Sequence, residues 1–241
     1  MTGRQRWRPH DLVRITDIAE IADALPDWSR AALQDAPFNP NQPALPVRPR
    51  LEEALPEWAS ASLAVCPWGV VRRAPHPSGL IPIGVRGPGR WQRHAVLVPS
   101  HAVTRTVSPE DLRARRPADR RLAVTLSAVA SLLADEPGGR PGDGGLVWGP
   151  TGAVGFELAT GHVVTHSGSD LDLLVRTPNR LDRAWAARLE TAFAALPARV
   201  DCQLDTPLGG IALADWARPD GPVMVRTDHG PELVDDPWAL A

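Results

Sequence analysis

The fold of this chain is decided by one stretch of alternating acidic and apolar residues, Ser169-Asp170-Leu171-Asp172-Leu173-Leu174-Val175. Alternate residues of a strand point to the same face, so Asp170 and Asp172 are predicted to share one face while Leu171 and Leu173 point into a core. Two carboxylates about 6–7 Å apart along a strand repel each other unless a cation lies between them. The pattern therefore predicts either a site for Mg²⁺, which prefers hard oxygen ligands, or an ordinary solvated strand face.

The segments on either side of this stretch supply the rest of a sheet. Upstream, residues 146–148 predict a short strand that runs into the glycine turn Gly149-Pro150-Thr151-Gly152. Downstream, apolar residues recur every three or four positions over 181–196 and predict an amphipathic helix. Residues 200–205 alternate apolar and polar side chains, which is typical of a half-buried strand, and 206–213 predict a hairpin back to another strand. This order predicts an α+β (α/β mixed) fold whose mixed sheet is flanked by helices.

A third carboxylate is expected on the strand next to the acidic pair. Asp201 is the first candidate, and Asp205 on the same face of that strand is the second. Three carboxylates around metal ions would form a site for in-line phosphoryl or nucleotidyl displacement. The sequence leaves open which of the two completes the site and which group acts as the general base.

The first part of the chain has a different pattern, punctuated by proline. Residues 24–37 and 54–67 repeat an Ala-Leu-Pro-acid-Trp motif, which predicts two short helices joined by a proline-rich connector. Three short apolar runs follow and predict strands. They lie at 68–73, 80–85 and 94–98.

A helix start marks the expected boundary between two domains. Ser108 is a favourable N-cap and is followed by Pro109, which suits the first helical position. A second apolar helical stretch is predicted at 122–133, before a glycine-rich loop. We therefore predict a smaller N-terminal α/β domain for substrate or partner binding at 1–107 and a catalytic domain at 108–241.

Charge is unevenly divided between these parts. The formal net charge is −2, but residues 1–107 hold 13 Arg and 9 acidic residues, whereas 108–241 hold 13 Arg and 19 acidic residues. Such a balance argues against broad, salt-driven nucleic-acid binding. Apolar runs fall short of the about 18 residues that a membrane span needs. With no signal-peptide pattern and only two cysteines, we expect a cytoplasmic protein with no nucleic-acid or membrane partner.

An arginine-rich tract lies in the first part. No acidic residue occurs between Glu57 and Glu110, whereas the tract includes Arg72 and Arg73. Arginine forks match phosphates and carboxylates, so the tract is predicted to bind an anionic substrate or an acidic partner protein. A solvated surface is the alternative. His10, which directly precedes Asp11, likewise has a catalytic and a structural interpretation.

The order of a glycine turn, an Asp-x-Asp strand and a third carboxylate resembles the polymerase-β-like nucleotidyltransferases. The resemblance extends to one family, the phosphoribosyl-dephospho-CoA transferase (holo-acyl-carrier-protein synthase) of malonate decarboxylase. It rests on Gly152–Gly161, on Ser169–Val175 and on His10-Asp11-Leu12-Val13, with further likeness at 70–73 and 83–87.

The resemblance implies a specific reaction. Members of this family transfer a prosthetic group from triphosphoribosyl-dephospho-CoA to a serine of the apo acyl-carrier subunit of malonate decarboxylase, and diphosphate leaves. Mg²⁺ would be held by Asp170, Asp172 and Asp201, the expected catalytic residues. Nucleotidyltransferases usually carry Gly-Ser or Gly-Gly in the upstream turn, whereas here Pro150 has no N–H to offer.

The expected substrate contacts therefore fall on the rest of that turn and on the arginines. They are Gly149, Thr151, Gly152, Ser169, Arg72 and Arg73. Two other functions remain open on the sequence. One is another nucleotidyltransferase that modifies a protein or a small molecule, and the other is a catalytically silent, antitoxin-like binding module.

Overall fold

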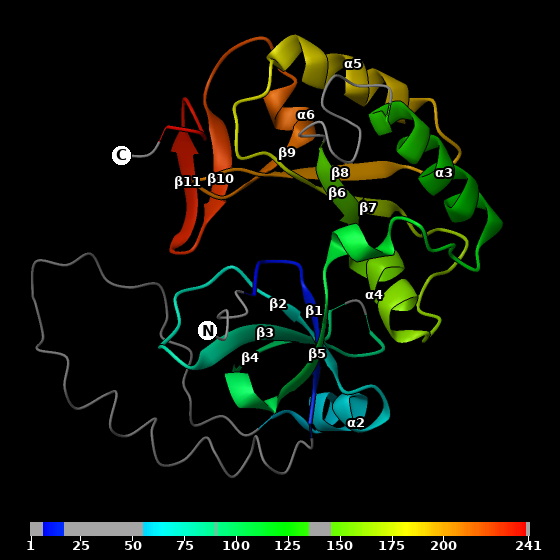
Figure 1. Ribbon diagram of the computed structural model, residues 1–241, viewed down its shortest axis with the longest axis vertical. Coiled ribbons are helices and arrows are strands. Elements are labelled where there is room, and N and C mark those ends of the chain that lie inside the picture. Colours follow the sequence, from blue (N-terminus) through cyan, green and yellow to red (C-terminus); the bar gives the residue numbers. More distant parts are fainter. Residues whose placement is uncertain (1–6, 17–54, 90, 135–145, 240–241) are drawn as a thin grey trace, which may run out of the picture. The chain divides into compact units, whose positions relative to one another are not determined.

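Six strands from the C-terminal part of the chain form a mixed sheet in the computed structural model, which describes residues 7–16, 55–89, 91–134 and 146–239. The strands lie in the order β11-β10-β9-β8-β7-β6, and every neighbouring pair is antiparallel except β7 and β8 (Figure 1). Their bounds are β6 Val147–Pro150, β7 Leu171–Arg176, β8 Val200–Asp205, β9 Gly210–Ala212, β10 Val223–Thr227 and β11 Gly230–Val234.

The parallel pair β7–β8 carries the acidic stretch. The helix α5 (Arg183–Ala194) connects the two strands, and the Asp182 side chain caps it by accepting the backbone N–H of Trp185 at 2.8 Å. Leu171 and Leu173 are buried, as the alternation predicted, and so is Cys202 on β8. One face of the pair is thus part of the core, which leaves the acidic residues to the other face.

Three further helices belong to this part of the chain. They are α3 (Arg120–Ala134), α4 (Gly152–Thr160) and α6 (Leu213–Trp216). Helices α3 and α4 contact β7, while α6 contacts β8 and β9. The predicted helix at 122–133 is confirmed, and the α+β class is confirmed by the helices that accompany two mixed or antiparallel sheets.

Three sequence predictions for this part need correction. The predicted turn at 149–152 is a single linking residue, Thr151, after which α4 begins directly. The glycines of α4 concealed this helix, because glycine disfavours helix formation. The helix predicted from Ser108 is only a short 3₁₀ turn, η2 (Pro109–Leu112), since Pro117 follows within two turns and disfavours helix before it. Leu213, assigned to a returning strand, is instead the first residue of α6.

The first part of the chain forms a five-stranded sheet in the order β4-β3-β2-β1-β5. The strands predicted at 68–73, 80–85 and 94–98 are confirmed, and the N-terminal motif and residues 103–107 add two that the sequence did not predict. The bounds are β1 Leu12–Ile15, β2 Trp68–Val71, β3 Leu80–Arg86, β4 Arg93–Pro99 and β5 Val103–Val107, with a 3₁₀ turn η1 at Ser100–Ala102.

One face of this sheet packs against the helix α2 (Glu57–Val65), which confirms the second of the two predicted short helices. Alternate β3 residues Ile81, Ile83 and Val85 point into the resulting core, where they join Leu63 of α2. Because side chains alternate along a strand, the residues between them point to the other face of the sheet.

The chain divides into two units, residues 1–9 with 13–106 and residues 10–12 with 107–241. The N-terminal His10-Asp11-Leu12 motif therefore belongs with the acidic strands. The assignment of a partner-binding domain and a catalytic domain stays a prediction. The predicted helix at 24–37, the connector after it and the glycine-rich loop at 137–145 lie outside the described residues. No helix in the described ranges is long and apolar enough to cross a membrane.

Candidate functional site

Asp172 and Asp201 are direct neighbours across the parallel strands β7 and β8. The register pairs the Cα atoms of these two residues, and paired residues of adjacent strands point their side chains to the same face. Asp172 is half-buried and Asp201 is exposed. Like charges directly opposite each other destabilise a sheet unless something offsets them. The cross-strand pair is therefore the strongest candidate for a cation site.

Gly152, the first residue of α4, leaves room for the Asp172 carboxylate. Its φ is +57°, a conformation that side chains disfavour, and a Cβ at this position would overlap the carboxylate itself. The preceding Thr151 donates its backbone N–H to the carbonyl oxygen of Asp172 at 2.8 Å. These contacts fix Asp172 at the N-terminus of α4, where the first-turn N–H groups give the helix a partial positive charge.

Asp170 lies one residue before β7 rather than within it, because the strand begins at Leu171. Its side chain is 43% exposed and forms a long ion pair with Arg199, whose Nη1 lies 3.8 Å from Oδ2. Across the described ranges, no three or more His, Cys, Asp or Glu side chains are grouped so that they could hold a metal ion. Mg²⁺ in proteins is often held by one or two carboxylates together with substrate phosphates, so the Asp172–Asp201 pair fits such an ion without a third ligand.

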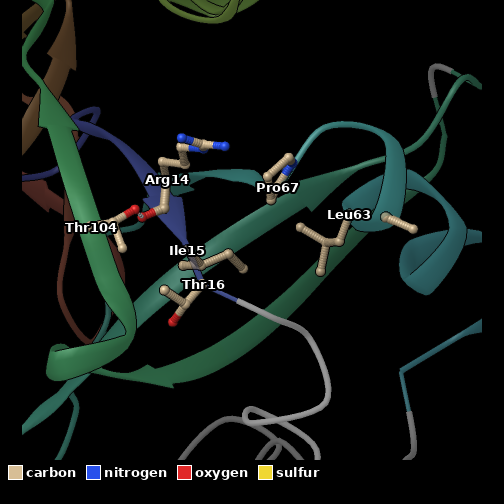
Figure 2. Close-up of a pocket in the computed structure, with 7 residues that line it drawn as sticks. Arg14, Ile15, Thr16, Leu63, Pro67 and Thr104 are labelled. Carbon is tan, nitrogen blue, oxygen red and sulfur yellow. Dashed lines mark hydrogen bonds between the residues drawn. The ribbon is translucent and has the colours of Figure 1, made fainter.

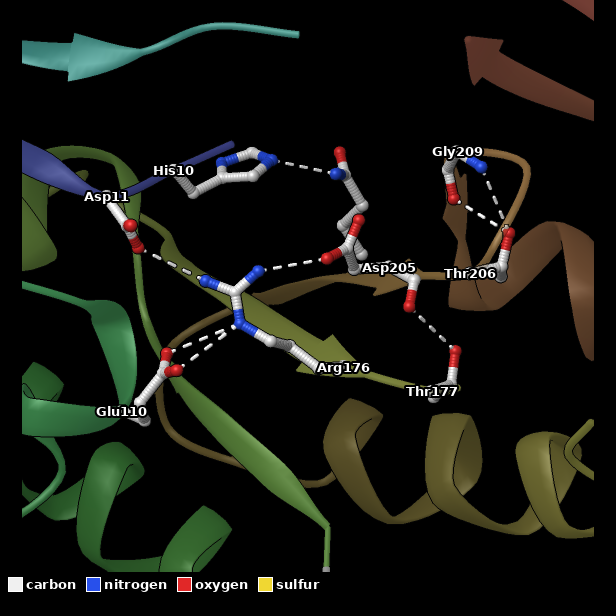
Figure 3. Close-up of polar contacts among 9 residues, drawn as sticks. His10, Asp11, Glu110, Arg176, Thr177, Asp205, Thr206 and Gly209 are labelled. Atoms are coloured by element: carbon white, nitrogen blue, oxygen red, sulfur yellow. Dashed lines mark hydrogen bonds and ion pairs between the residues drawn. The ribbon is translucent and has the colours of Figure 1, made fainter. Parts of the chain in front are cut away.

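Asp205, the second candidate for the third carboxylate, serves a different purpose. It is the cross-strand partner of Arg176, and its Oδ2 lies 2.9 Å from Nη1 of that arginine. The same guanidinium contacts Asp11 at 3.3 Å and Glu110 at 3.4 Å (Figure 3). Asp205 lies four positions after Asp201 on β8, and its carboxylate is already held, so Asp201 is the better candidate.

Ser169 and Glu157 shape the loop that precedes the acidic strand. The buried Ser169 accepts the backbone N–H of His166 on its Oγ at 3.0 Å. Glu157 of α4 is buried and accepts hydrogen bonds from the hydroxyl of Thr165 and the backbone N–H of Ala118. Burial raises the pKa of Glu157, but the bonds from Thr165, Ala118 and Val164 outweigh it and hold the pKa below its usual value. Ser169 and Glu157 thus stabilise the loop that leads into the acidic strand.

Close packing explains why residue 149 is a glycine. Gly149 is buried on β6, and a Cβ there would overlap the backbone of Pro109 in η2. The substrate contact predicted for Gly149 therefore has no support in the structure. Thr151 and Gly152 do lie at the surface beside Asp172, and the Thr151 side chain forms no capping hydrogen bond with α4.

The arginine tract places three arginines on the outer face of the five-stranded sheet. Arg72 is exposed, and its stem lies over Gly84 of β3. Arg86 and Arg93 are direct cross-strand partners in the antiparallel pair β3–β4, which again sets like charges opposite each other. Arg73 is half-buried beyond the end of β2. The outer face is thus basic and suited to an anionic partner.

A pocket in the same unit was not indicated by the sequence. It has a volume of about 390 Å³, with Ile15, Leu63 and Pro67 as its apolar lining and Arg14, Thr16 and Thr104 as its polar lining (Figure 2). Both threonine hydroxyls donate to backbone carbonyls, Thr16 to Ala102 and Thr104 to Arg14. With no carboxylate or imidazole in its lining, this pocket lacks the chemistry of the acidic pair.

Comparison with known families covers both units. Residues 111–237 match the model of the phosphoribosyl-dephospho-CoA transferase MdcG C-terminal domain, and residues 8–109 match that of the N-terminal domain. The chain belongs to the phosphoribosyl-dephospho-CoA transferase family. The resemblance found in the sequence is thereby confirmed.

Similar members of the phosphoribosyl-dephospho-CoA transferase family occur in several bacteria. The chain is 43% identical over 232 residues to a phosphoribosyl-dephospho-CoA transferase of Pseudomonas putida strain GB-1, which covers 96% of this chain and 95% of the relative. It is 34% identical over 240 residues to the transferase of that name from Klebsiella pneumoniae, with 96% of each chain covered. No solved structure matches the chain.

Membership in the phosphoribosyl-dephospho-CoA transferase family makes the chain a transferase of the same type as its named relatives. The roles of individual residues stay predictions. Sequence reasoning missed Arg176, which is only the end of an apolar strand in the sequence, and Gln203 and Arg226, whose partners come from distant segments. The neighbouring His10-Asp11 motif is the one sequence signal that pointed towards them.

Proposed function

We propose that this chain transfers the phosphoribosyl-dephospho-CoA group from triphosphoribosyl-dephospho-CoA to a serine of the apo acyl-carrier subunit of malonate decarboxylase, with release of diphosphate. The proposal is supported by the names of its relatives and by family models that span both units. The observation that carries it is the cross-strand pair Asp172–Asp201 beside the N-terminus of α4. The pair combines carboxylate ligands for a cation with backbone donors for phosphate.

The carboxylates of Asp172 and Asp201, with Asp170 at the entrance to β7, are the proposed Mg²⁺ ligands. Asp172 is fixed by Gly152 and by the strand, whereas Asp170 is exposed and must exchange its long contact with Arg199 to join them. A bound Mg²⁺ would offset the charge of the attacking and leaving oxygens. This is the nucleotidyltransferase type of catalysis, in which positioning and charge account for most of the rate.

The N-terminus of α4 is the proposed phosphate contact. Helix N-termini bind anions because their first N–H groups lack partners inside the helix. Pro150 has no N–H, so the contact would come from Gly152, the amides that follow it and the hydroxyl of Thr151. Thr151 is available for this, since its side chain does not cap the helix.

The bond changes follow from the donor. The carrier serine oxygen forms a bond to the phosphorus next to the ribose, the bond from that phosphorus to the diphosphate oxygen breaks, and the serine gives up its proton. Asp201 has two proposed roles that exclude each other in one state, either as a metal ligand or as the acceptor of this proton. Its exposed position permits both.

The basic outer face of the five-stranded sheet is the proposed contact for the donor's phosphates or for the carrier subunit. Arg72 is exposed on it, and the half-buried Arg73 follows in the chain beyond the end of β2. Reversing both charges with Arg72→Glu and Arg73→Glu should raise the apparent KM for one of the two substrates. Unchanged KM values for both would refute a role for this face.

The deciding experiment is mass spectrometry of the apo carrier subunit after incubation with triphosphoribosyl-dephospho-CoA and Mg²⁺. The expected result is a gain of one prosthetic group with the wild-type protein and none with Asp170→Asn or Asp172→Asn. Asp215→Asn is a matched control, because Asp215 is 42% exposed and also pairs with an arginine, Arg218 at 3.5 Å.

Wild-type rates in the Asp170 and Asp172 variants would refute the proposed site. Modification only when nucleoside triphosphates replace the donor would instead support another nucleotidyltransferase. Failure to bind Mg²⁺ or to modify any acceptor would favour a binding module.

A further inference from the structure

Besides the Arg176 cluster, a second set of hydrogen-bonded side chains lies on the sheet face that carries the acidic pair. Gln203 follows Asp201 by two residues on β8, so the two side chains point to the same face. The Oε1 atom of Gln203 accepts a hydrogen bond from Nη1 of Arg226 at 2.9 Å. Its Nε2 atom lies 2.8 Å from Nε2 of His10, a bond drawn in Figure 3.

The chemistry of Arg226, Gln203 and His10 sets the direction of the hydrogen bonds between them. A guanidinium only donates hydrogen bonds, so Arg226 requires the carbonyl oxygen of Gln203 to face it. The amide nitrogen must then face His10, and because that nitrogen only donates, Nε2 of the imidazole is the acceptor. His10 is thereby held as the neutral tautomer with its proton on Nδ1. It adopts φ +73°, the positive φ that non-glycine residues rarely take, so the backbone too is held in an unusual state here.

Gly210 on β9 makes the reach of Arg226 possible. It is the cross-strand partner of Asp205 on one side and of Arg226 on the other, so all three lie on one face. A Cβ at this position would lie 2.5 Å from Nε2 and 2.9 Å from Cδ of Gln203. The glycine therefore lets Gln203 lie flat over β9 and lets the guanidinium approach β8.

The charges on this face single out Arg226. The guanidinium of Arg176 is occupied by the carboxylates of Asp11, Glu110 and Asp205. Arg226 is exposed, and the ion pairs found within the described ranges leave it without a carboxylate partner. A polyphosphate bound at the acidic pair brings negative charge that needs a further cation, and a guanidinium suits phosphate because it can donate two parallel hydrogen bonds.

We propose that Arg226, held across Gly210 by Gln203 and His10, binds a phosphate group of the donor. The inference rests on the proposed function, since it takes the polyphosphate to lie at the Asp172–Asp201 pair. One N–H of the guanidinium is used by Gln203, and the others are left to the phosphate. Gln203 and His10 are positioning residues, which act through Arg226.

The test measures binding of inorganic triphosphate with Mg²⁺ to the full chain by isothermal titration calorimetry. Arg226→Met is expected to weaken triphosphate binding about 10-fold or more and to raise the KM for the donor, because a charge-assisted hydrogen bond is lost. Its thermal stability should not change, as the side chain is exposed. Arg188→Met, at an exposed arginine of α5, is the matched control and should bind as the wild type does.

Two variants test the positioning of Arg226. Gln203→Glu should hold the guanidinium in an ion pair and weaken triphosphate binding, and it should turn His10 into a donor at Nε2. The ¹⁵N shifts of His10 should change from those of the Nδ1-protonated tautomer to those of a ring that carries a proton on Nε2. Gly210→Ala should displace Gln203 and weaken binding by less than Arg226→Met.

The outcomes separate this inference from the proposed function. A wild-type protein that transfers the group, together with an Arg226→Met variant of unchanged triphosphate affinity and donor KM, would overturn the inference alone. Wild-type ¹⁵N shifts of His10 in Gln203→Glu would overturn the positioning chain. A wild-type protein that neither binds triphosphate nor transfers the group would overturn the proposed function and this inference together.

Discussion

The two ends of the β7–β8 pair carry acidic residues on the same face but hold them in opposite ways. At one end Asp172 stands opposite Asp201, a pairing of like charges. At the other end Arg176 stands opposite Asp205 and also contacts Asp11 and Glu110, and its side chain is only 9% exposed. The strands, register and face are shared, so the difference lies in the partners that other segments bring.

This difference separates architecture from binding chemistry. A buried guanidinium between carboxylates from three distant segments ties those segments together, and its removal leaves buried charges without compensation. A cross-strand pair of aspartates has the opposite effect on stability. The repulsion between the carboxylates weakens the sheet slightly, and the pair presents negative charge. Stability measurements and activity measurements should therefore respond in opposite ways at the two ends.

The largest effect is expected at the buried end. Arg176→Met should lower the free energy of unfolding by about 3–5 kcal/mol, since it leaves three carboxylates without their cation. Urea denaturation followed by circular dichroism measures this. A loss below about 1 kcal/mol, the level of an exposed ion pair, would show that the cluster does not hold the fold together.

The next effect should be on activity at the exposed end. Asp172→Asn should reduce the rate of group transfer about 10²- to 10³-fold or more, by removing charge from the proposed reaction centre. Its free energy of unfolding should change by less than about 1 kcal/mol, because the lost repulsion with Asp201 and the lost attraction to the N-terminus of α4 oppose each other. A variant that loses stability and activity together would place Asp172 with the structural residues, like Arg176.

Glu157, which supports the loop before the acidic strand, should have an intermediate effect. Glu157→Gln should cost about 1–3 kcal/mol at pH 7, because a buried acceptor of several hydrogen bonds is altered. The pKa of Glu157 is lowered in the folded protein, so its contribution is present above its ordinary value of 4.5 and is lost as the pH falls through the lowered pKa. Denaturation at several pH values should show the two proteins converging below about pH 4.5. A gap that widens on acidification would contradict this sign.

The smallest effect is expected for Asp201. Asp201→Asn should raise the free energy of unfolding by about 0.2–1 kcal/mol in the absence of Mg²⁺, since the repulsion with Asp172 is removed. The same change should weaken Mg²⁺ binding, measured by calorimetry. If stability falls instead, the pair does not repel and the cation site loses its physical basis.

Local sequence predicted the elements that carry a strong period. The β7 and β8 strands, the helix α5 and the three strands from 68 to 98 follow from alternation or from three- and four-residue spacing. Helix α4 was missed because two glycines and a mostly apolar composition hide its period. The helix predicted from Ser108 was too long because Pro117 ends it early. The sequences of β10 and β11 show no pattern that distinguishes them from a loop.

The part of the candidate site that comes from nearby segments of the sequence was predictable. Asp170 and Asp172 are adjacent in sequence, and Asp201 follows after one crossover helix, so spacing was enough to propose them. Asp205 was a reasonable alternative until Arg176 was found opposite to it. Gly149 looked like part of a phosphate-binding turn, but the close approach of Pro109 accounts for it.

The sequence by itself determined the α+β class, the acidic strand, the family and its expected reaction. Only the tertiary structure decided which acidic residues contact Arg176 and which face each other across β7 and β8. It also showed that Gln203 links His10 to Arg226, residues separated by most of the chain. Local patterns report the direction in which a side chain points, whereas the partner it meets depends on which distant segment folds against it.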